Sequence, residues 1–375
     1  MNKSIFLIAG EKSGDDLGFR LMVEIQKATT SIKFHGIGGP LMQSCGLTSL
    51  FPYETLSVMG FVEILPKIFE LKAKINQTAE AILKLKPDLV ITIDLPGFNY
   101  RVVKLLRDRG YSGKIFHYVA PTVWAYKENR ASKFAKIFDR MICILPHEPP
   151  YFKKYDLITD YIGNPVIEQN PQINREIKDE VRKILICCGS RIIEIQRLMP
   201  IFSQALNALA QQYNFEAIIL THSSNTDLIG KILQNAEFKY KISTPEYAEK
   251  IKIIANCDLA LSKSGTITTE IALAGVPMIV AHKINWLSYI IIKSMIKISS
   301  ICLVNIIANK QIIPELIQGN CTAETIRDSL AEYITNPKMR KEQVKNASKI
   351  FKLLGLGKQP SPSQKLCSII LNALK

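Results

Sequence analysis

The chain alternates short, uninterrupted apolar runs with longer stretches in which apolar residues recur every three or four positions. The short runs are typical of strands buried in a parallel sheet, and the longer stretches are typical of amphipathic helices. This alternation predicts the α/β class. Strands are predicted at Ser4–Ala9, Phe34–Ile37, Leu89–Asp94, Lys114–Val119, Met141–Leu145, Lys183–Cys188, Ala217–Thr221, Lys239–Ile242 and Asp258–Leu261, and in the run that ends at Val280. Helices are predicted up to about residue 27 and over 66–85, 192–212, 225–236, 245–256, 268–274 and 323–353.

The same order of strand, glycine-containing loop and helix occurs in two successive halves of similar size, and a polar stretch at Glu168–Asp179 separates them. We therefore predict two doubly wound, Rossmann-like α/β domains that face one cleft. The first covers residues 1–167 and the second covers residues 168–354. The tail 355–375 begins with a hinge rich in glycine and proline and ends in an amphipathic helix. This helix is predicted to cross back to the first domain or to bind a neighbouring subunit in a homodimer.

The stretch Leu259–Val280 is predicted to form a strand, a tight loop, a helix, a turn and a second strand. The loop contains Ser264, Gly265 and Thr266, and the first N–H groups of the helix after it lack intrahelical partners and carry partial positive charge. Gly265 would let an anion approach the backbone, while Glu270 lies one turn beyond Thr266 on the same face. This geometry suits a nucleoside diphosphate, with Glu270 on a sugar diol. The alternative is an N-capped helix in a parallel sheet with a solvated glutamate.

Asp94 is the predicted general base, because it stands at the end of a buried strand. The carboxyl ends of parallel strands face the ligand crevice of an open α/β sheet. Burial by the apolar residues that follow Asp94 would raise its pKa towards a useful value. The alternative is that Asp94 caps the next helix, since aspartate is common at turns. Glu11 and Asp15, which flank Ser13 in the first glycine-containing loop, are rival bases.

A second loop, Gly189-Ser190-Arg191, follows a strand in the second half of the chain. Arginine at a strand end can clamp a diphosphate through two parallel hydrogen bonds. The sequence has no Asp-x-Asp pattern, so a metal-held diphosphate is not indicated and no cofactor is predicted. Loop amides and Arg191 are expected to neutralise the diphosphate instead.

The formal net charge of +15 is compatible with three partners: nucleic acid, an anionic membrane surface or phosphorylated substrates. The lysines are spread over the whole chain, only 8% of residues are aromatic and no nucleic-acid motif is present, which argues against nucleic acid. The eight cysteines are scattered, as in cytosolic proteins. The first apolar run is too short for a signal peptide.

Ile284–Ile307 comes nearest to a membrane-spanning stretch, and Lys293 and Lys297 interrupt it. No spanning helix is predicted, because a span needs about 18 or more apolar residues. The segment suits a membrane-facing helix, and a buried helix whose lysine ammonium groups reach water explains it equally well.

Motifs throughout the chain resemble, in order, those of the lipid-A-disaccharide synthases, which are glycosyltransferases of the two-domain B type. The resemblance covers nearly the whole chain. The motifs are GEKSGD at 10–15, GIGGPLM at 36–42, VMGFVEIL at 58–65, PDLVITIDLPGFN at 87–99, HYVAPTVWAY at 117–126, GSR at 189–191 and SGTITTE at 264–270.

This resemblance implies an inverting transfer of 2,3-diacylglucosamine from UDP to 2,3-diacylglucosamine-1-phosphate, giving a disaccharide and UDP in lipid A biosynthesis. Another B-type enzyme, such as a muramyl-type transferase or a UDP-sugar 2-epimerase, is the alternative. By the resemblance, Asp94 is the base. The implied UDP contacts are Gly189, Ser190, Arg191, Ser264, Gly265, Thr266 and Glu270, with Asn305 lining the donor site.

The resemblance also implies lipid-linked, anionic substrates. The enzyme is therefore expected to dock on the cytoplasmic face of the inner membrane as a peripheral protein. Val58, Met59, Phe61 and Trp286 are the predicted acyl or membrane contacts.

Overall fold

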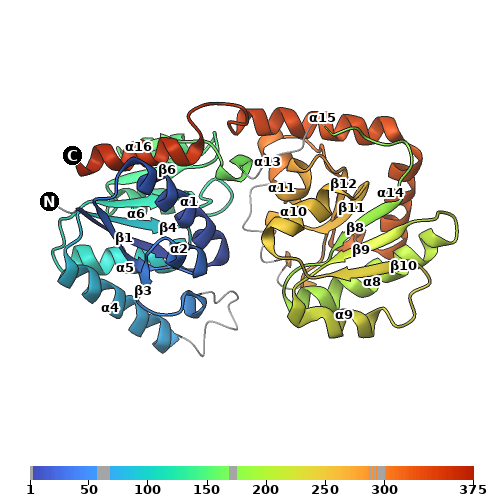
Figure 1. Cartoon of the computed structure of the whole chain (residues 1–375), viewed down its shortest axis with the longest axis horizontal. Helices are drawn as coiled ribbons and strands as arrows, with labels where there is room; N and C mark the ends of the chain where they lie inside the picture. The colour runs from blue at the N-terminus through green and yellow to red at the C-terminus, as the bar shows by residue number, and fades with distance from the viewer. Residues whose placement is uncertain (1–2, 57–67, 169–174, 287–288, 291–292, 294–299) are drawn as a thin grey trace. The chain divides into compact units, whose positions relative to one another are not determined.

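The computed structural model describes residues 3–56, 68–168, 175–286, 289–290, 293 and 300–375 (Figure 1). The chain forms two compact units. The first comprises Met1–Pro165 together with Gly357–Lys375, and the second comprises Val166–Leu356. Each unit is built on its own parallel sheet, which confirms the predicted α/β class. The chain passes from the first unit to the second after Pro165 and returns to the first unit at Gly357.

The first unit contains a seven-stranded parallel sheet with the strand order β3-β2-β1-β4-β5-β6-β7. β2 and β3 lie on one side of β1, and β4 to β7 lie on its other side. The strand order therefore reverses between β1 and β4, and an open α/β sheet binds ligands at the carboxyl ends of the strands at such a reversal. The strands are β1 (Lys3–Ala9), β2 (Ile32–Ile37), β3 (Thr48–Ser49), β4 (Leu89–Ile93), β5 (Ile115–Tyr118), β6 (Arg140–Cys143) and β7 (Ile158–Tyr161).

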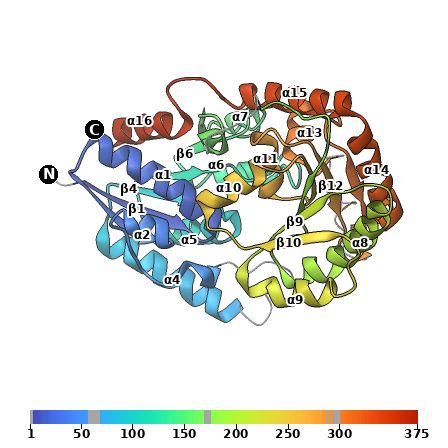
Figure 2. The same cartoon turned by 45° about the vertical axis from the view of Figure 1, so that its right-hand side comes forward.

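Helices cover both faces of the first sheet. Ile5 and Leu7 of β1 point into the core under α1 and α16, and Phe6 and Ile8 point into the core under α4 and α5. Figures 1 and 2 show α16 beside α1, so the C-terminal helix crosses back to the first unit, as predicted. The helices are α1 (Lys12–Ala28), α2 (Pro40–Ser44), η1 (Tyr53–Leu56), α4 (Ile68–Leu85), α5 (Pro96–Asp108), α6 (Arg130–Ala135), α7 (Pro149–Lys153) and α16 (Pro362–Leu374).

The second unit contains a six-stranded parallel sheet with the order β10-β9-β8-β11-β12-β13, which reverses between β8 and β11. On one face α8 and α14 pack over a shared core, and elsewhere α11 packs against α10, α13 and α15. The strands are β8 (Lys183–Cys187), β9 (Glu216–Leu220), β10 (Lys239–Ser243), β11 (Leu259–Lys263), β12 (Met278–His282) and β13 (Glu315–Ile317). The helices are α8 (Ile192–Ala210), η4 (Ser223–Asn225), α9 (Thr226–Ile232), α10 (Tyr247–Ala255), α11 (Thr266–Leu273), α13 (Leu303–Ala308), η5 (Gln318–Asn320), α14 (Ala323–Thr335) and α15 (Pro337–Leu353); η3 (Pro165–Glu168) lies where the chain enters this unit.

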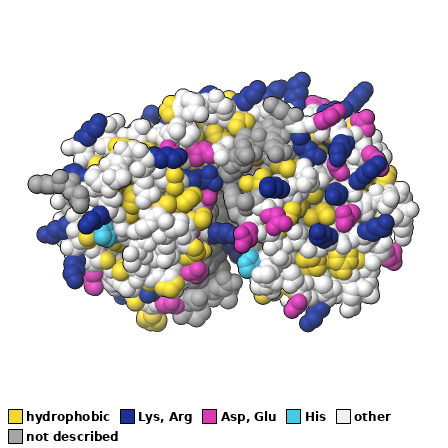
Figure 3. Space-filling view, in the orientation of Figure 1, with side chains coloured by type: hydrophobic (Ala, Val, Ile, Leu, Met, Phe, Trp, Pro, Cys, Tyr) yellow, Lys and Arg dark blue, Asp and Glu magenta, His cyan; other side chains and the backbone are white. Residues whose placement is uncertain are grey.

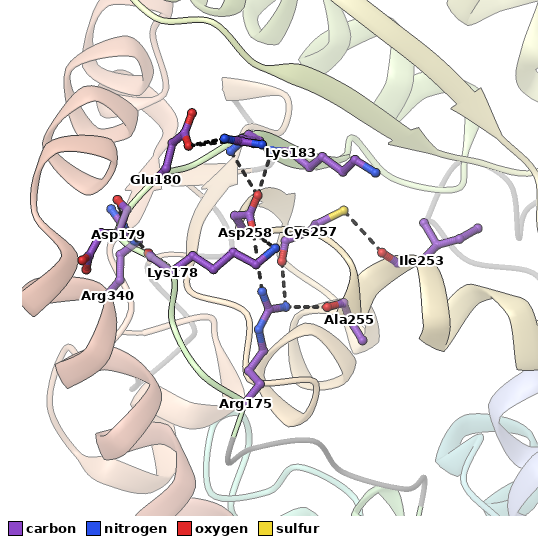
Figure 4. Close-up of polar contacts among 11 residues, drawn as sticks. Arg175, Lys178, Asp179, Glu180, Lys183, Ile253, Ala255, Cys257, Asp258 and Arg340 are labelled. Atoms are coloured by element: carbon purple, nitrogen blue, oxygen red, sulfur yellow. Dashed lines mark hydrogen bonds and ion pairs between the residues drawn. The ribbon is translucent and has the colours of Figure 1, made fainter.

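The stretch 168–179, predicted as an interdomain linker, is bound to the second unit over its last residues (Figure 4). Arg175 donates to the carbonyl oxygen of Ala255 at the end of α10, at 2.6 Å. Arg340 of α15 is completely buried and donates to the carbonyl oxygen of Lys178 at 2.8 Å. The last residues of this stretch therefore belong to the second unit and are not a linker, because Arg175 reaches a carbonyl of that unit and Arg340 of that unit satisfies a carbonyl of the stretch.

Candidate active site

The loops after β8 and β11 carry most of the predicted donor-site residues. These strands pair directly, with Cys187 opposite Ser262, so the loops 189–191 and 264–265 emerge side by side. We call them the second-unit loops. The strand order reverses at this point, which is where open α/β sheets bind ligands.

Glu194, in the first turn of α8, folds back over the loop that precedes this helix. Gly189 has φ +114°, and a Cβ there would lie 2.4 Å from Glu194 Oε2, so glycine is required. The same Oε2 accepts a hydrogen bond from the backbone N–H of Ser190 at 3.2 Å. Glu194 Oε1 lies 2.9 Å from Lys263 Nζ and 3.7 Å from Arg191 Nη1. One carboxylate therefore links two cations beside the loops.

The electrostatics of this cluster follow from its burial and charges. Burial acts to raise the pKa of Glu194, but the hydrogen bond and charge of Lys263 outweigh burial, so the pKa lies below its ordinary value. At the end of β12, burial and the charge of Lys263 lower the pKa of His282 to about 4. At neutral pH the His282 imidazole is therefore uncharged, and the positive charge beside it is that of Lys263.

The loop after β11 leaves its backbone open to solvent. Gly265 and Thr266 are exposed, and a Cβ at Gly265 would meet no atom within 4 Å. The Ser264 hydroxyl donates to the carbonyl oxygen of Ile301 at 3.1 Å, which fixes the start of the loop. α11 begins at Thr266, two positions earlier than the sequence predicted, because the Thr268 hydroxyl and N–H both donate to the Gly265 carbonyl. The N-terminal amides of α11 therefore open onto the exposed loop.

Glu270 lies in α11 and its side chain is 9% exposed. Its Oε2 is 2.6 Å from Nζ of Lys250, a residue of α10. The sequence predicted a carboxylate that is free to bind a sugar diol, whereas the structure holds one of its oxygens in an ion pair. The pair fixes the carboxylate in one orientation.

Asn305, predicted to line the donor site, is 1% exposed. Its amide nitrogen donates to the Ile313 carbonyl and to Glu315 Oε1, both at 2.8 Å. Its oxygen accepts from the N–H groups of Ile312 at 2.8 Å and Ile313 at 2.9 Å. The chain thus uses all four hydrogen-bonding positions of the amide. In this structure Asn305 holds the segment between α13 and β13, and a ligand contact stays a prediction.

In the first unit, Asp94 lies at the reversal between β1 and β4. Asp94 and Leu95 have φ +49° and +46°, a left-handed conformation that costs non-glycine residues roughly 1 kcal/mol or more each. A Cβ at Gly10 would lie 2.5 Å from Leu95 Cδ2, so glycine lets the two loops meet. Burial raises the pKa of the Asp94 carboxyl, and a hydrogen bond from the Leu95 N–H opposes this rise. The direction of the shift is the one that the sequence predicted.

The first loop presents its predicted residues differently. Asp15 is 2% exposed and accepts three backbone N–H groups at the start of α2, at distances of 2.8 to 3.0 Å. Its carboxylate is therefore engaged in holding α2. Ser13 is exposed, and Glu11 is half-buried in the N-cap position of α1. Of the two rival bases, Glu11 has the more accessible carboxylate.

Three residues outside the predicted site follow the ends of β5 and β6 in the first unit: Trp124, His147 and Glu148. The rings of Trp124 and His147 meet edge to face, with centroids 4.7 Å apart. Glu148 is 1% exposed, and burial raises its pKa to about 7 although the N–H groups of Leu145 and Ile144 donate to its carboxylate. Its place after a strand was visible in the sequence, but its burial was not.

Trp286 follows β12 and is 67% exposed, and Val58, Met59 and Phe61 lie outside the described residues. Over the part of the chain that the structure describes, no helix combines the length and apolarity needed to cross a bilayer. Within the same residues, no group of three or more His, Cys, Asp or Glu side chains could hold a metal ion. Lysine and arginine side chains are scattered over the face shown in Figure 3.

Two α/β units, each with glycine-containing loops at the reversal of its strand order, define the fold of B-type glycosyltransferases and related nucleotide-sugar enzymes. Solved structures share this fold. The UDP-GlcNAc 2-epimerase from Neisseria meningitidis bound to UDP-GlcNAc aligns with TM-score 0.66 and 13% identity, covering 98% of this chain and all of that chain. MurG from Acinetobacter baumannii aligns with TM-score 0.60 and 14% identity, covering 99% of this chain and all of that chain.

Sequence similarity identifies the family within this fold. Residues 5–368 match the family described as lipid-A-disaccharide synthetase. The lipid-A-disaccharide synthase of Rickettsia bellii (strain OSU 85-389) is 43% identical over 379 residues, and that of Rickettsia prowazekii (strain Madrid E) is 42% identical over 378 residues; each alignment covers 98% of both chains. The chain belongs to the lipid-A-disaccharide synthase family, and it is therefore a glycosyltransferase.

Proposed function

We propose that the protein transfers the sugar of UDP-2,3-diacylglucosamine to the 6-hydroxyl of 2,3-diacylglucosamine-1-phosphate, releasing UDP. The main support for this proposal is that the second-unit loops lie side by side where the strand order of the second sheet reverses. There the exposed backbone at Gly265, the charge of Arg191 and the carboxylate of Glu270 lie on neighbouring elements. These are the three features that a nucleoside diphosphate sugar requires.

The reaction is an inverting displacement at the anomeric carbon. The acceptor hydroxyl oxygen forms the new bond, the bond between the anomeric carbon and the diphosphate oxygen breaks, and UDP leaves with that electron pair. Asp94 takes the hydroxyl proton in this proposal, since its raised pKa makes its carboxylate a better base than an exposed one. Glu11 is the stronger of the two rivals, because it is more exposed than Asp15.

The donor side supplies positive charge to the leaving diphosphate. In the proposal, the amides of Ser264 to Thr266 and the guanidinium of Arg191 bind the diphosphate, and Gly189 and Ser190 shape the neighbouring loop. Fixed donors of this kind stabilise charge that develops in the transition state. Glu270 binds the ribose hydroxyls, in an orientation that Lys250 maintains.

Both substrates are anionic and carry acyl chains, so we propose that the protein is peripheral on the cytoplasmic face of the inner membrane. Its excess of positive charge contributes roughly 1 kcal/mol per lysine near an anionic surface. Trp286, together with Val58, Met59 and Phe61, is the proposed apolar contact. Co-sedimentation with anionic vesicles should be strong at low salt, and absence of binding to any vesicle would disprove docking. Gel filtration tests a homodimer formed through the C-terminal helix.

Release of UDP with and without the diacylated acceptor tests the activity. The proposed transferase releases UDP only when 2,3-diacylglucosamine-1-phosphate is present. A UDP-sugar 2-epimerase would act on its substrate without this acceptor, and a muramyl-type transferase would require a different one. A nucleic-acid-binding protein would do neither, and its affinity for nucleic acid would fall steeply with salt.

A further inference from the structure

Lys263 occupies the last position of β11, directly before the exposed loop at Ser264 and Gly265. Its ammonium group lies 2.9 Å from Glu194 Oε1, and its side chain is 22% exposed. Glu194 is its hydrogen-bond acceptor among the residues that the structure describes. An ammonium group has three N–H donors, so two remain for a ligand on the loop.

We propose that Lys263 binds the diphosphate of the nucleotide sugar and that Glu194 positions it, an inference that rests on the proposed function. Lys263 at the end of β11 and Arg191 in the loop after β8 approach the same carboxylate oxygen, at 2.9 and 3.7 Å. The three side chains together carry one net positive charge. Glu194 thus keeps two like charges close to each other before the ligand binds, and the diphosphate then supplies the missing negative charge.

The shape of the loop supports this role for Glu194. The carboxylate can reach both cations only because residue 189 is a glycine, since a Cβ there would lie 2.4 Å from Glu194 Oε2. The hydrogen bond from the Ser190 N–H fixes the other side of the carboxylate. Lys263 therefore stands at a defined place beside the loop and does not sample many rotamers in water, which reduces the entropy lost when it binds a ligand.

Competitive inhibition by uridine, UMP and UDP tests the proposal on the full-length protein. In Lys263→Met, the inhibition constant of UDP should rise about tenfold to a hundredfold, because a hydrogen bond to a charged group is lost. The constant of UMP should rise less and that of uridine should not change. Lys263→Arg should recover part of the loss. Lys183→Met is the matched control, since this exposed lysine starts β8 at the opposite end of the sheet.

Equal losses for uridine, UMP and UDP would show that Lys263 supports only the loop structure and would overturn the inference, as would unchanged UDP inhibition. A double-mutant cycle tests the positioning by Glu194. The loss caused by Lys263→Met should be clearly smaller in a Glu194→Gln background, and additive losses would exclude positioning. If the unaltered protein neither binds UDP nor forms the disaccharide, the proposed function itself fails, which is a different result.

Discussion

Replacing Asp94 by asparagine removes the group that accepts the proton and keeps the conformation and hydrogen bond of the loop after β4. Asparagine has nearly the same shape, tolerates the left-handed φ of +49°, and its side-chain oxygen can still accept the Leu95 N–H. An alanine would add backbone strain to the loss of the carboxylate. A general base contributes about 10²- to 10⁴-fold to the rate, so kcat should fall by this factor, which corresponds to about 3 to 5 kcal/mol.

The substitution should also change the pH dependence of activity and of stability. The kcat/KM of the unaltered protein should rise with pH as Asp94 loses its proton, and this rise should disappear in Asp94→Asn. Burial raises the pKa of Asp94 in the folded state, so the unfolded chain releases this proton at lower pH. Stability conferred by the protonated form is therefore lost as the pH rises from the unfolded to the folded pKa. Above that interval the asparagine variant should be more stable than the parent.

The assay is acceptor-dependent UDP release across pH, with thermal melting measured on the same samples. Asp108→Asn is the matched control, because this exposed aspartate ends the helix that follows Asp94 and forms a surface ion pair with Lys104. Full turnover in Asp94→Asn would refute its role as the base. A large loss of UDP affinity in the same variant would show that Asp94 acts on the donor.

Three further predictions concern pairs and buried groups. Lys250→Met should reduce the preference for UDP over 2′-deoxy-UDP several-fold in inhibition assays, because Glu270 loses its fixed orientation; an unchanged preference would contradict this. The unaltered protein should lose up to about 3 kcal/mol of unfolding free energy as the pH rises from 4.5 to about 7, because the buried Glu148 loses its proton. Glu148→Gln should not show this loss, as measured by urea unfolding at several pH values. Arg340→Met should lower the unfolding free energy by about 3 kcal/mol, whereas the neighbouring exposed substitution Lys341→Met should change it by less than about 0.5 kcal/mol; equal effects would contradict the role of the buried arginine.

The strands and the glycine loops could be predicted because their signals are local. Runs such as Leu89–Ile93 are apolar except for Thr92, since a parallel strand is covered on both faces, and the polar residue after each run marks the edge where ligands bind. Asp94 and Arg191 were found in this way. The repetition of strand, glycine loop and helix in two halves predicted two units, and the family motifs then indicated the B-type fold.

The sequence could not reveal contacts between separate elements. The pairs Lys250 with Glu270 and Lys263 with Glu194 join helices and strands that only the fold brings together. For the same reason, the sequence could not show that Asp15 is engaged by α2. Each of these residues is polar, so its type alone did not distinguish a ligand contact from a structural one.

Mass spectrometry of the products formed from purified UDP-2,3-diacylglucosamine and 2,3-diacylglucosamine-1-phosphate tests the central claim most directly. We predict a tetraacyl disaccharide monophosphate in equal amount to the UDP released, and almost none with Asp94→Asn. Release of UDP with only free diacylglucosamine as the second product, or no reaction with these two precursors, would contradict the proposed transfer.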